Sequence, residues 1–189
     1  MLAADVAGYS RLMAGDERAT VRTLTQYREV FAEHVAAHRG RIVDTAGDSV
    51  LATFDSVVEA VEAAVEIQRA LGEHNEALDE HRQMHFRIGV NLGDTIHRDD
   101  GTIYGDGVNV AARLEALAAP GGVMLSGSAN EQVEGKLDVG LADAGSHEVK
   151  NIAKPVRAWR VVLDGGAPFL PAGHQRFLRG RRSGIVDQS

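Results

Sequence analysis

RIVDTAGDSVLATF, residues Arg41–Phe54, has the pattern of two short strands joined by a tight turn. Apolar and β-branched residues lead into the turn and out of it again, and Gly47 can take the positive φ that such a turn requires. Two acids, Asp44 and Asp48, fall at the tip. Their mutual repulsion favours a cation, a ligand or a partner chain beside them; the alternative is that both point into solvent.

The whole chain has 189 residues, of which 44% are hydrophobic and 25% charged, as expected for a globular protein with one domain. We expect that domain to span residues 1–163, and residues 164–189, rich in Gly, Pro and Arg, to form a flexible tail or linker. The net charge of −7 argues against a nucleic-acid partner. The absence of cysteine, of a long apolar run and of a signal peptide predicts a cytoplasmic chain without membrane contact.

Hydrophobic periodicity indicates an alternation of strands and helices along the chain. The first predicted strand, residues 2–6, lacks a lead-in, which leaves open whether the chain is a fragment. Helices are predicted at 16–38, 57–77, 108–118 and 126–133, and further strands at 84–92, 95–97, 123–125, 141–143, 146–150 and 156–163. Ser56 and Glu59 have capping-box spacing at the start of the second helix. The order β, α, β-hairpin, α, β predicts an α+β fold with a ferredoxin-like βαββαβ core, a mostly antiparallel sheet and helices covering one face of it.

Asp5, at the end of the first strand, precedes a turn containing Gly8 that leads into a helix. Backbone amides exposed in such a turn can hold a phosphate. If the first strand lies beside the hairpin, Asp5 and Asp48 meet at one end of the sheet. Two carboxylates without nearby His or Cys suit Mg²⁺ or Mn²⁺. The alternative is two unrelated surface acids.

A third segment, YGDGVNVAARLE at residues 104–115, carries Asn109 and Arg113 four residues apart and therefore on one helix face. The small residues around them allow another surface to approach closely, and a guanidinium suits phosphate recognition. The alternative is an exposed polar stripe.

Together these segments resemble the class III adenylate/guanylate cyclase catalytic domain. The matching motifs are AADVAGYSRL, TAGDSVLATF, RIGVNLGD, YGDGVNVAARLE and VKNIAKPVRAWRV, which span nearly everything before the tail. The resemblance implies an enzyme of cyclic-nucleotide signalling that converts ATP to 3′,5′-cyclic AMP and pyrophosphate. It also implies two Mg²⁺ or Mn²⁺ ions bound by Asp5, Asp48 and the Val6 carbonyl. One ion would activate the ribose 3′-oxygen and the other would hold the triphosphate.

The resemblance assigns ribose orientation to Asn109 and transition-state stabilisation to Arg113. Gly8 would face the phosphates, and Lys150 or Lys154 would reach the terminal ones, although the spacing there departs from the family. The family's sites form between two chains. We therefore expect a head-to-tail homodimer, in which the metal-binding acids come from one protomer, and Asn109 and Arg113 from the other.

Two positions that select the base depart from the commonest adenylate cyclase pattern. Asp44 stands where Lys is usual. Thr102 stands where Asp is usual, as in one large bacterial subgroup. Thr102 could donate to adenine N1 while Asp44 accepts from N6, so ATP, the expected substrate, remains possible with this pair. Two alternatives remain: a guanylate or dual-specificity cyclase, since Asp44 could accept from guanine N1 and N2, and a catalytically silent domain that dimerises and regulates.

Overall fold

The computed structural model describes residues 1–93, 96–97, 103–148 and 155–163. Thr102, Lys150, Lys154 and the tail at 164–189 lie outside the described residues. The helices are α1 Tyr9–Gly15, α2 Glu17–Ala37, α3 Val57–Glu76, the short 3₁₀ helix η1 Glu80–Arg82, α4 Asp106–Leu117 and α5 Gly127–Val133. The strands are β1 Leu2–Val6, β2 Arg41–Asp44, β3 Val50–Thr53, β4 Phe86–Val90, β5 Ile96–His97, β6 Ile103–Tyr104, β7 Val123–Ser126, β8 Gly140–His147 and β9 Val156–Val162.

Seven strands form one sheet in the order β2-β3-β1-β4-β7-β9-β8, and β5 pairs with β6 separately. All neighbours in the large sheet are antiparallel except β4 and β7. The sub-order β2-β3-β1-β4, with helices between β1 and β2 and between β3 and β4, is the ferredoxin-like arrangement. The predicted fold class is therefore confirmed.

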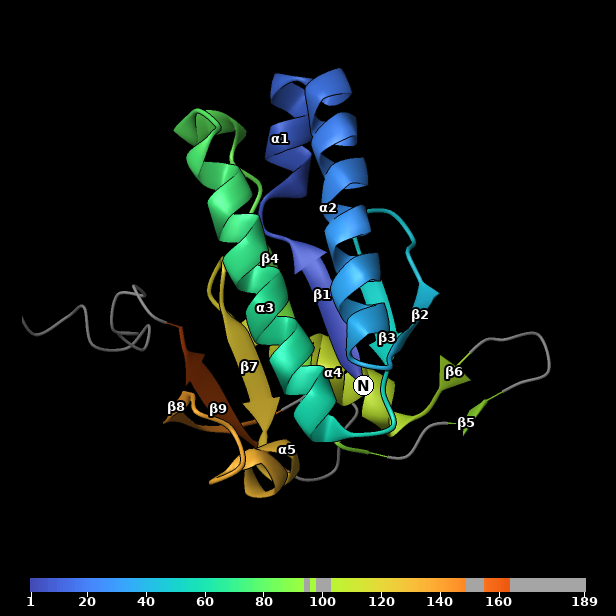
Figure 1. Cartoon of the computed structure of the whole chain (residues 1–189), viewed down its shortest axis with the longest axis vertical. Helices are drawn as coiled ribbons and strands as arrows, with labels where there is room; N and C mark the ends of the chain where they lie inside the picture. The colour runs from blue at the N-terminus through green and yellow to red at the C-terminus, as the bar shows by residue number, and fades with distance from the viewer. Residues whose placement is uncertain (94–95, 98–102, 149–154, 164–189) are drawn as a thin grey trace, which may run out of the picture.

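The two faces of the sheet are covered by different helices (Figure 1). Side chains alternate between faces along a strand. Leu2 and Ala4 of β1 thus join the main core with α2 and α3, whereas Ala3 packs with Ala111 of α4. The expectation that helices cover one face holds for α2 and α3, but α4 lies against the other face. Asp5 follows the same alternation and points toward the α4 side.

Three local features differ from the sequence prediction. The turn after β1 contains a separate short helix, α1, ahead of α2. β8 is one strand with a bulge between Asp143 and Gly145, where two short strands were expected. The capping box is wrong: Ser56 makes no side-chain cap bond, and the Glu59 carboxylate pairs with Arg39. Among the described helices, none is both long and apolar enough to cross a membrane.

Candidate functional site

Asp5 is held by a two-pronged ion pair with a side chain that the sequence analysis did not single out. The Arg87 guanidinium, on β4, donates from Nε to Asp5 Oδ1 at 2.9 Å and from an Nη to Oδ2 at 2.6 Å. Asp5 and Arg87 are register partners across β1 and β4, and both lie on the α4 side of the sheet. Such a fork fixes the carboxylate at the end of β1.

Glu115 of α4 brings a second carboxylate to this pair. Its carboxylate lies 3.6 Å from the Arg87 guanidinium. This approach depends on Gly89, because a Cβ at that position would lie 2.2 Å from the Ala111 carbonyl oxygen and 2.3 Å from the Glu115 nitrogen. Only glycine lets α4 pack this closely on β4.

The environment changes the charge of Glu115. The pKa of Glu115 is raised to about 8, first by burial, then by hydrogen bonding to Asp5 and by the charges of Asp5 and Asp48, while Arg87 acts in the opposite direction. Hydrogen bonding to Asp5 also raises the pKa of Arg87. Near neutral pH the protein alone therefore holds a largely protonated Glu115 beside an ionised guanidinium.

Asp48 reaches the same region from the β2–β3 hairpin, whose loop lies at the same edge of the sheet as the end of β1 (Figure 1). β3 pairs antiparallel with β1, with Ala4 opposite Val50, and the charge of Asp48 acts on both Arg87 and Glu115. The predicted turn conformation at Gly47 is confirmed by its φ of 60°.

Arg28 of α2 anchors the hairpin loop from behind. One Nη donates to the Thr45 carbonyl oxygen at 2.6 Å and to that of Gly47. These two bonds tie the residues just before Asp48 to a helix that is itself packed on the sheet. Asp48 is therefore carried on a supported loop rather than on a free tip.

The donor chemistry of this corner fits a hard divalent cation. Asp5, Asp48 and Glu115 supply only carboxylate oxygens, and Val6, the buried last residue of β1, adds a backbone carbonyl. Oxygen-only donor sets suit Mg²⁺ or Mn²⁺. Arg87 takes one lone pair on each oxygen of Asp5, so each oxygen keeps a second lone pair that a cation could use.

Asn109 and Arg113 do not join this cluster. Both are exposed on α4, and each lies two residues from Ala111, or about 200° around the helix. Ala111 is fully buried against the sheet, so Asn109 and Arg113 face away from the Asp5 side of their own chain. The two halves of the predicted site therefore lie on opposite sides of α4.

The remaining predicted residues are placed only in part. Gly8 is exposed and left-handed at the N-terminal end of α1. Asp44 is exposed at the end of β2, opposite Leu51 and next to a register shift. Thr102, Lys150 and Lys154 lie in the parts of the chain that the structure does not describe.

Sequence reasoning missed Arg87, Glu115 and Arg28. A signal existed for Arg87: it is a charged residue within a strand whose other face is apolar. Glu115 lies four residues after Ala111, on the buried face of α4, where an acid requires a partner. Nothing local marked Arg28, because its carbonyl partners are defined only once the hairpin folds back on α2.

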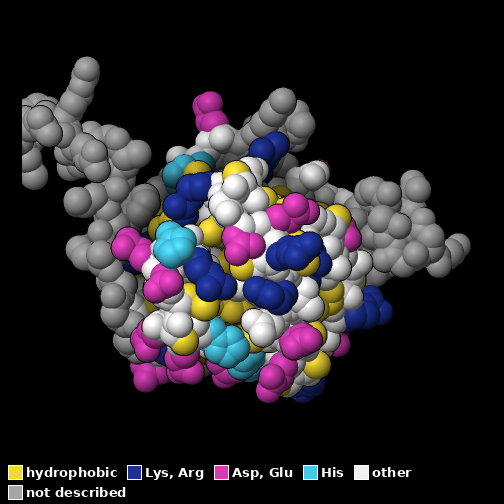
Figure 2. Space-filling model, turned by 90° about the horizontal axis from the view of Figure 1, so that it is seen from above, with side chains coloured by type: hydrophobic (Ala, Val, Ile, Leu, Met, Phe, Trp, Pro, Cys, Tyr) yellow, Lys and Arg dark blue, Asp and Glu magenta, His cyan; other side chains and the backbone are white. Residues whose placement is uncertain are grey.

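A separate hollow of about 300 Å³ lies at the end of the molecule that carries α1, and its lining includes Arg11, Asp16, His81 and Arg82. Viewed from that end, basic, acidic and histidine side chains are interspersed (Figure 2). A surface of mixed sign produces no single-signed field to attract a polyanion.

The comparisons with known proteins agree on one family. Residues 1–162 match the model of the adenylate and guanylate cyclase catalytic domain. A Rhizobium meliloti protein named "Putative adenylate cyclase 3" is 49% identical over 160 residues, which are 84% of this chain and 27% of that protein. The chain thus spans about a quarter of that relative's length.

Two solved structures extend the likeness to three dimensions. An adenylate/guanylate cyclase/hydrolase from Silicibacter pomeroyi has 41% identity and a TM-score of 0.77, covering 86% of this chain and 95% of that chain. The guanylyl cyclase Cya2 has 25% identity and a TM-score of 0.71, covering 86% of this chain and 90% of that chain.

Proposed function

Because the chain belongs to the adenylate and guanylate cyclase catalytic domain family, we propose that it is a nucleotide cyclase that converts ATP to 3′,5′-cyclic AMP and pyrophosphate. The observation that carries the proposal is the meeting of Asp5, Asp48 and Glu115 around Arg87 at one edge of the sheet. In the reaction, the ribose 3′-oxygen loses its proton and bonds to the α-phosphorus. The bond from that phosphorus to the pyrophosphate oxygen breaks.

Asp5, Asp48 and the Val6 carbonyl would hold two Mg²⁺ or Mn²⁺ ions. When bound, such ions neutralise phosphate charge and favour loss of the 3′-hydroxyl proton. The Arg87 guanidinium, held beside these carboxylates, has further N–H donors that could pair with a phosphate oxygen.

Asn109 and Arg113 would act on the nucleotide bound to a second copy of the chain. Their exposure on the far side of α4 from Asp5 supports this arrangement. In a head-to-tail homodimer each site would take its acids from one protomer, and the ribose-orienting Asn109 and the charge-stabilising Arg113 from the other. Gly8, with Lys150 or Lys154, would contact the phosphates.

The base would be selected by Asp44 and Thr102. The 49% identity to a protein named as an adenylate cyclase favours ATP. A guanylate cyclase is the second candidate, because the exposed Asp44 carboxylate could accept from both guanine N1 and N2.

The test is direct: purified full chain with Mn²⁺ or Mg²⁺ and either ATP or GTP, with products resolved by chromatography. Cyclic AMP from ATP is the expected product. Formation of cyclic GMP from GTP, without cyclic AMP from ATP, would favour the second candidate. If neither cyclic nucleotide forms, while metal-dependent nucleotide binding persists, the domain would be a silent regulator and the enzyme proposal would fail.

A further inference from the structure

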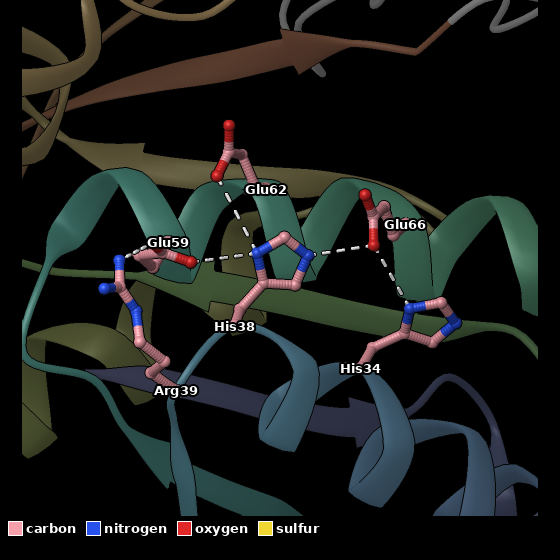
Figure 3. Close-up of polar contacts among 6 residues, drawn as sticks. All are labelled: His34, His38, Arg39, Glu59, Glu62 and Glu66. Carbon is pink, nitrogen blue, oxygen red and sulfur yellow. Dashed lines mark hydrogen bonds and ion pairs between the residues drawn. The ribbon is translucent and has the colours of Figure 1, made fainter.

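A second group of metal-ligand side chains lies between the C-terminal end of α2 and the first turns of α3 (Figure 3). His38 Nδ1 is 3.1 Å from Glu59 Oε2 and 3.7 Å from Glu62 Oε2. These three ligand atoms all lie within 4.8 Å of one another. In a tetrahedral site with bonds of 2.0–2.1 Å, ligand atoms are about 3.3 Å apart, so the arrangement is close to what one ion requires.

This group is remote from the catalytic corner, the cluster of Asp5, Asp48 and Glu115 around Arg87. β1 runs from Leu2, paired with Ala52, toward Asp5, at the hairpin-loop end of the sheet. α2 ends and α3 begins at the opposite end of the sheet, where β2 starts and β3 finishes. An ion bound by His38 would therefore be distinct from those proposed at Asp5 and Asp48.

The other nitrogen of His38 supplies an independent indication. Nε2 lies 2.9 Å from Glu66 Oε2, and the same oxygen lies 3.3 Å from His34 Nδ1. A metal-binding histidine commonly donates its second N–H to a carboxylate, which fixes the ring and leaves the first nitrogen free to bind the ion. Nε2 faces Glu66, and Nδ1 faces Glu59 and Glu62, so Nδ1 would bind an ion in place of its own proton.

Glu59 is oriented in the same way. Its Oε1 accepts from the Arg39 guanidinium, which leaves Oε2 beside His38. Partial burial limits competing water, since the His38 and Glu59 side chains are 14% and 20% exposed. The 41% exposure of Glu62 gives an ion access from solvent.

The charges also call for a cation. Three glutamates face one another here, and Arg39 offsets one of them. A divalent ion bound between these side chains would offset the charge of the remaining glutamates.

We propose that His38, Glu59 and Glu62 form a binding site for a transition-metal ion such as Zn²⁺, with Glu66 and His34 orienting the imidazole and a fourth position open to water. One imidazole with two carboxylates suits Zn²⁺ or Co²⁺ better than Mg²⁺. The ion would join α2 to α3 and so stabilise the helical layer.

The test uses the tag-free full chain, stripped of metal by chelation and held in excess Mg²⁺. Co²⁺ and Zn²⁺ are titrated separately. The expected results are one tight Co²⁺ equivalent with the strong visible absorption of four-coordinate cobalt, and a Zn²⁺-dependent rise in Tm of about 5 °C or more when Zn²⁺ exceeds Kd about a hundredfold.

Substitutions show which side chains bind the ion. His38→Asn and the more exposed Glu62→Gln should each weaken Co²⁺ binding at least about 10-fold, and Glu66→Gln should weaken it about 10-fold through loss of ring orientation. Glu73→Gln, an exposed glutamate on the same helix, is the matched control and should bind as the parent does. Circular dichroism checks that each variant is folded.

Two outcomes would overturn the proposal. One is a parent protein without the cobalt band or the Zn²⁺-dependent Tm shift. The other is a band that survives both His38→Asn and Glu62→Gln but disappears in Asp48→Asn, which would place the ion at the catalytic corner instead.

Discussion

Asp48 is the residue whose role can be tested with least structural disturbance. It lies on a loop held by Arg28 through the carbonyls of Thr45 and Gly47, not through its own side chain. Asp48→Asn should leave Tm within about 1 °C, because surface changes away from special features are usually near neutral. It should lower kcat at least about 100-fold, because a metal contribution of several kcal/mol is lost.

The assay is cyclic nucleotide formation with Mn²⁺ and ATP, alongside a thermal melt. Asp55→Asn, an exposed acid just beyond β3, is the control and should keep full activity. An Asp48→Asn enzyme with undiminished kcat would contradict the assignment of Asp48 as a metal ligand.

Asp44 tests the base-reading proposal separately from the metals. If its carboxylate accepts from adenine N6, Asp44→Ala should lower kcat/KM for ATP about 10- to 100-fold, the range for a hydrogen bond to a charged group. Mn²⁺ affinity should not change. The control is Thr45→Ala, whose backbone carbonyl still accepts from Arg28. An unchanged value for ATP with a reduced value for GTP would favour the guanylate alternative.

At the residue scale, the sequence was sufficient to predict the location of groups whose place in the fold follows from their position along the chain. Asp5 is the next-to-last residue of β1 and Asp48 follows a glycine turn, and the structure brings both to one end of the sheet. The contacts of Arg87 and Glu115 with Asp5 could not be predicted without knowing which strands and helices pack side by side. The fork depends on the β1–β4 register that sets Asp5 opposite Arg87, and register between distant strands is not written in either strand alone.

Gly89 lies inside β4, at the point where the close packing of α4 on that strand positions Glu115. Any side chain there would meet the backbone of α4, which cannot give way without moving Glu115. Gly89→Val should destabilise the protein by about 2–3 kcal/mol, the upper part of the overpacking range, and should reduce activity beyond the loss of folded protein.

Gly72→Ala is the matched control, since nothing lies within 4 Å of a Cβ there and the residue is in helix α3. It should be neutral or stabilise by up to about 1 kcal/mol. Urea unfolding and activity per folded molecule provide the two measurements. A stable, fully active Gly89→Val protein would show that α4 is not held by this approach.

A buried network joins α2, α3 and the start of β4. The Tyr27 hydroxyl donates to Asn75 Oδ1 at 2.7 Å, and Asn75 bonds both the N–H and the carbonyl of Met84. Burial raises the pKa of Tyr27 to about 12 from an ordinary value of 10.0. Tyr27 therefore stays protonated in the folded chain at pH values where the unfolded chain ionises.

The sign follows from linkage. The contribution of Tyr27 is complete below pH 10 and is lost as pH rises toward 12. Tyr27→Phe should cost about 1 kcal/mol at pH 8, and this difference from the parent should shrink progressively above pH 10. The measurement is urea unfolding of both proteins from pH 8 to 11. A gap that stays constant over that range would refute the assignment.

At the element scale, periodicity predicted the long helices α2 and α3 and the central strands, because each buries one apolar face. It failed where tertiary contacts determine the partner of a side chain or the face on which a helix packs. Glu59 has capping-box spacing with Ser56 but pairs with Arg39 and His38 instead. α4 has a short apolar face, and its packing on the opposite side of the sheet follows from the sheet, not from the helix pattern.

At the scale of the molecule, the predicted catalytic groups separate into two sets that one chain cannot bring together. Asp5 lies on the α4 side of the sheet and Asp48 on the adjacent hairpin loop, whereas Asn109 and Arg113 lie on the outward side of α4. A homodimer with shared sites would reunite them twice. Neither Asp48→Ala nor Arg113→Ala alone should then leave a working site in a homodimer of that variant.

Mixing the two inactive variants tests this arrangement. In a mixed dimer, one site combines the intact Asp48 of the Arg113→Ala chain with the intact Arg113 of the Asp48→Ala chain, while the other site carries both defects. With equal amounts and random exchange, half of the dimers are mixed and each has one working site of two. Activity should recover to about one quarter of the parent's, at the same total protein.

The controls are each variant alone and a mixture of Asp48→Ala with Asp48→Asn, neither of which should recover. Subunit exchange is verified independently by energy transfer between labelled protomers. If exchange is complete and activity stays at background, then Asp48 and Arg113 do not act on one nucleotide from different chains. The outward orientation of Arg113 would then need another explanation, such as an exposed polar stripe on α4.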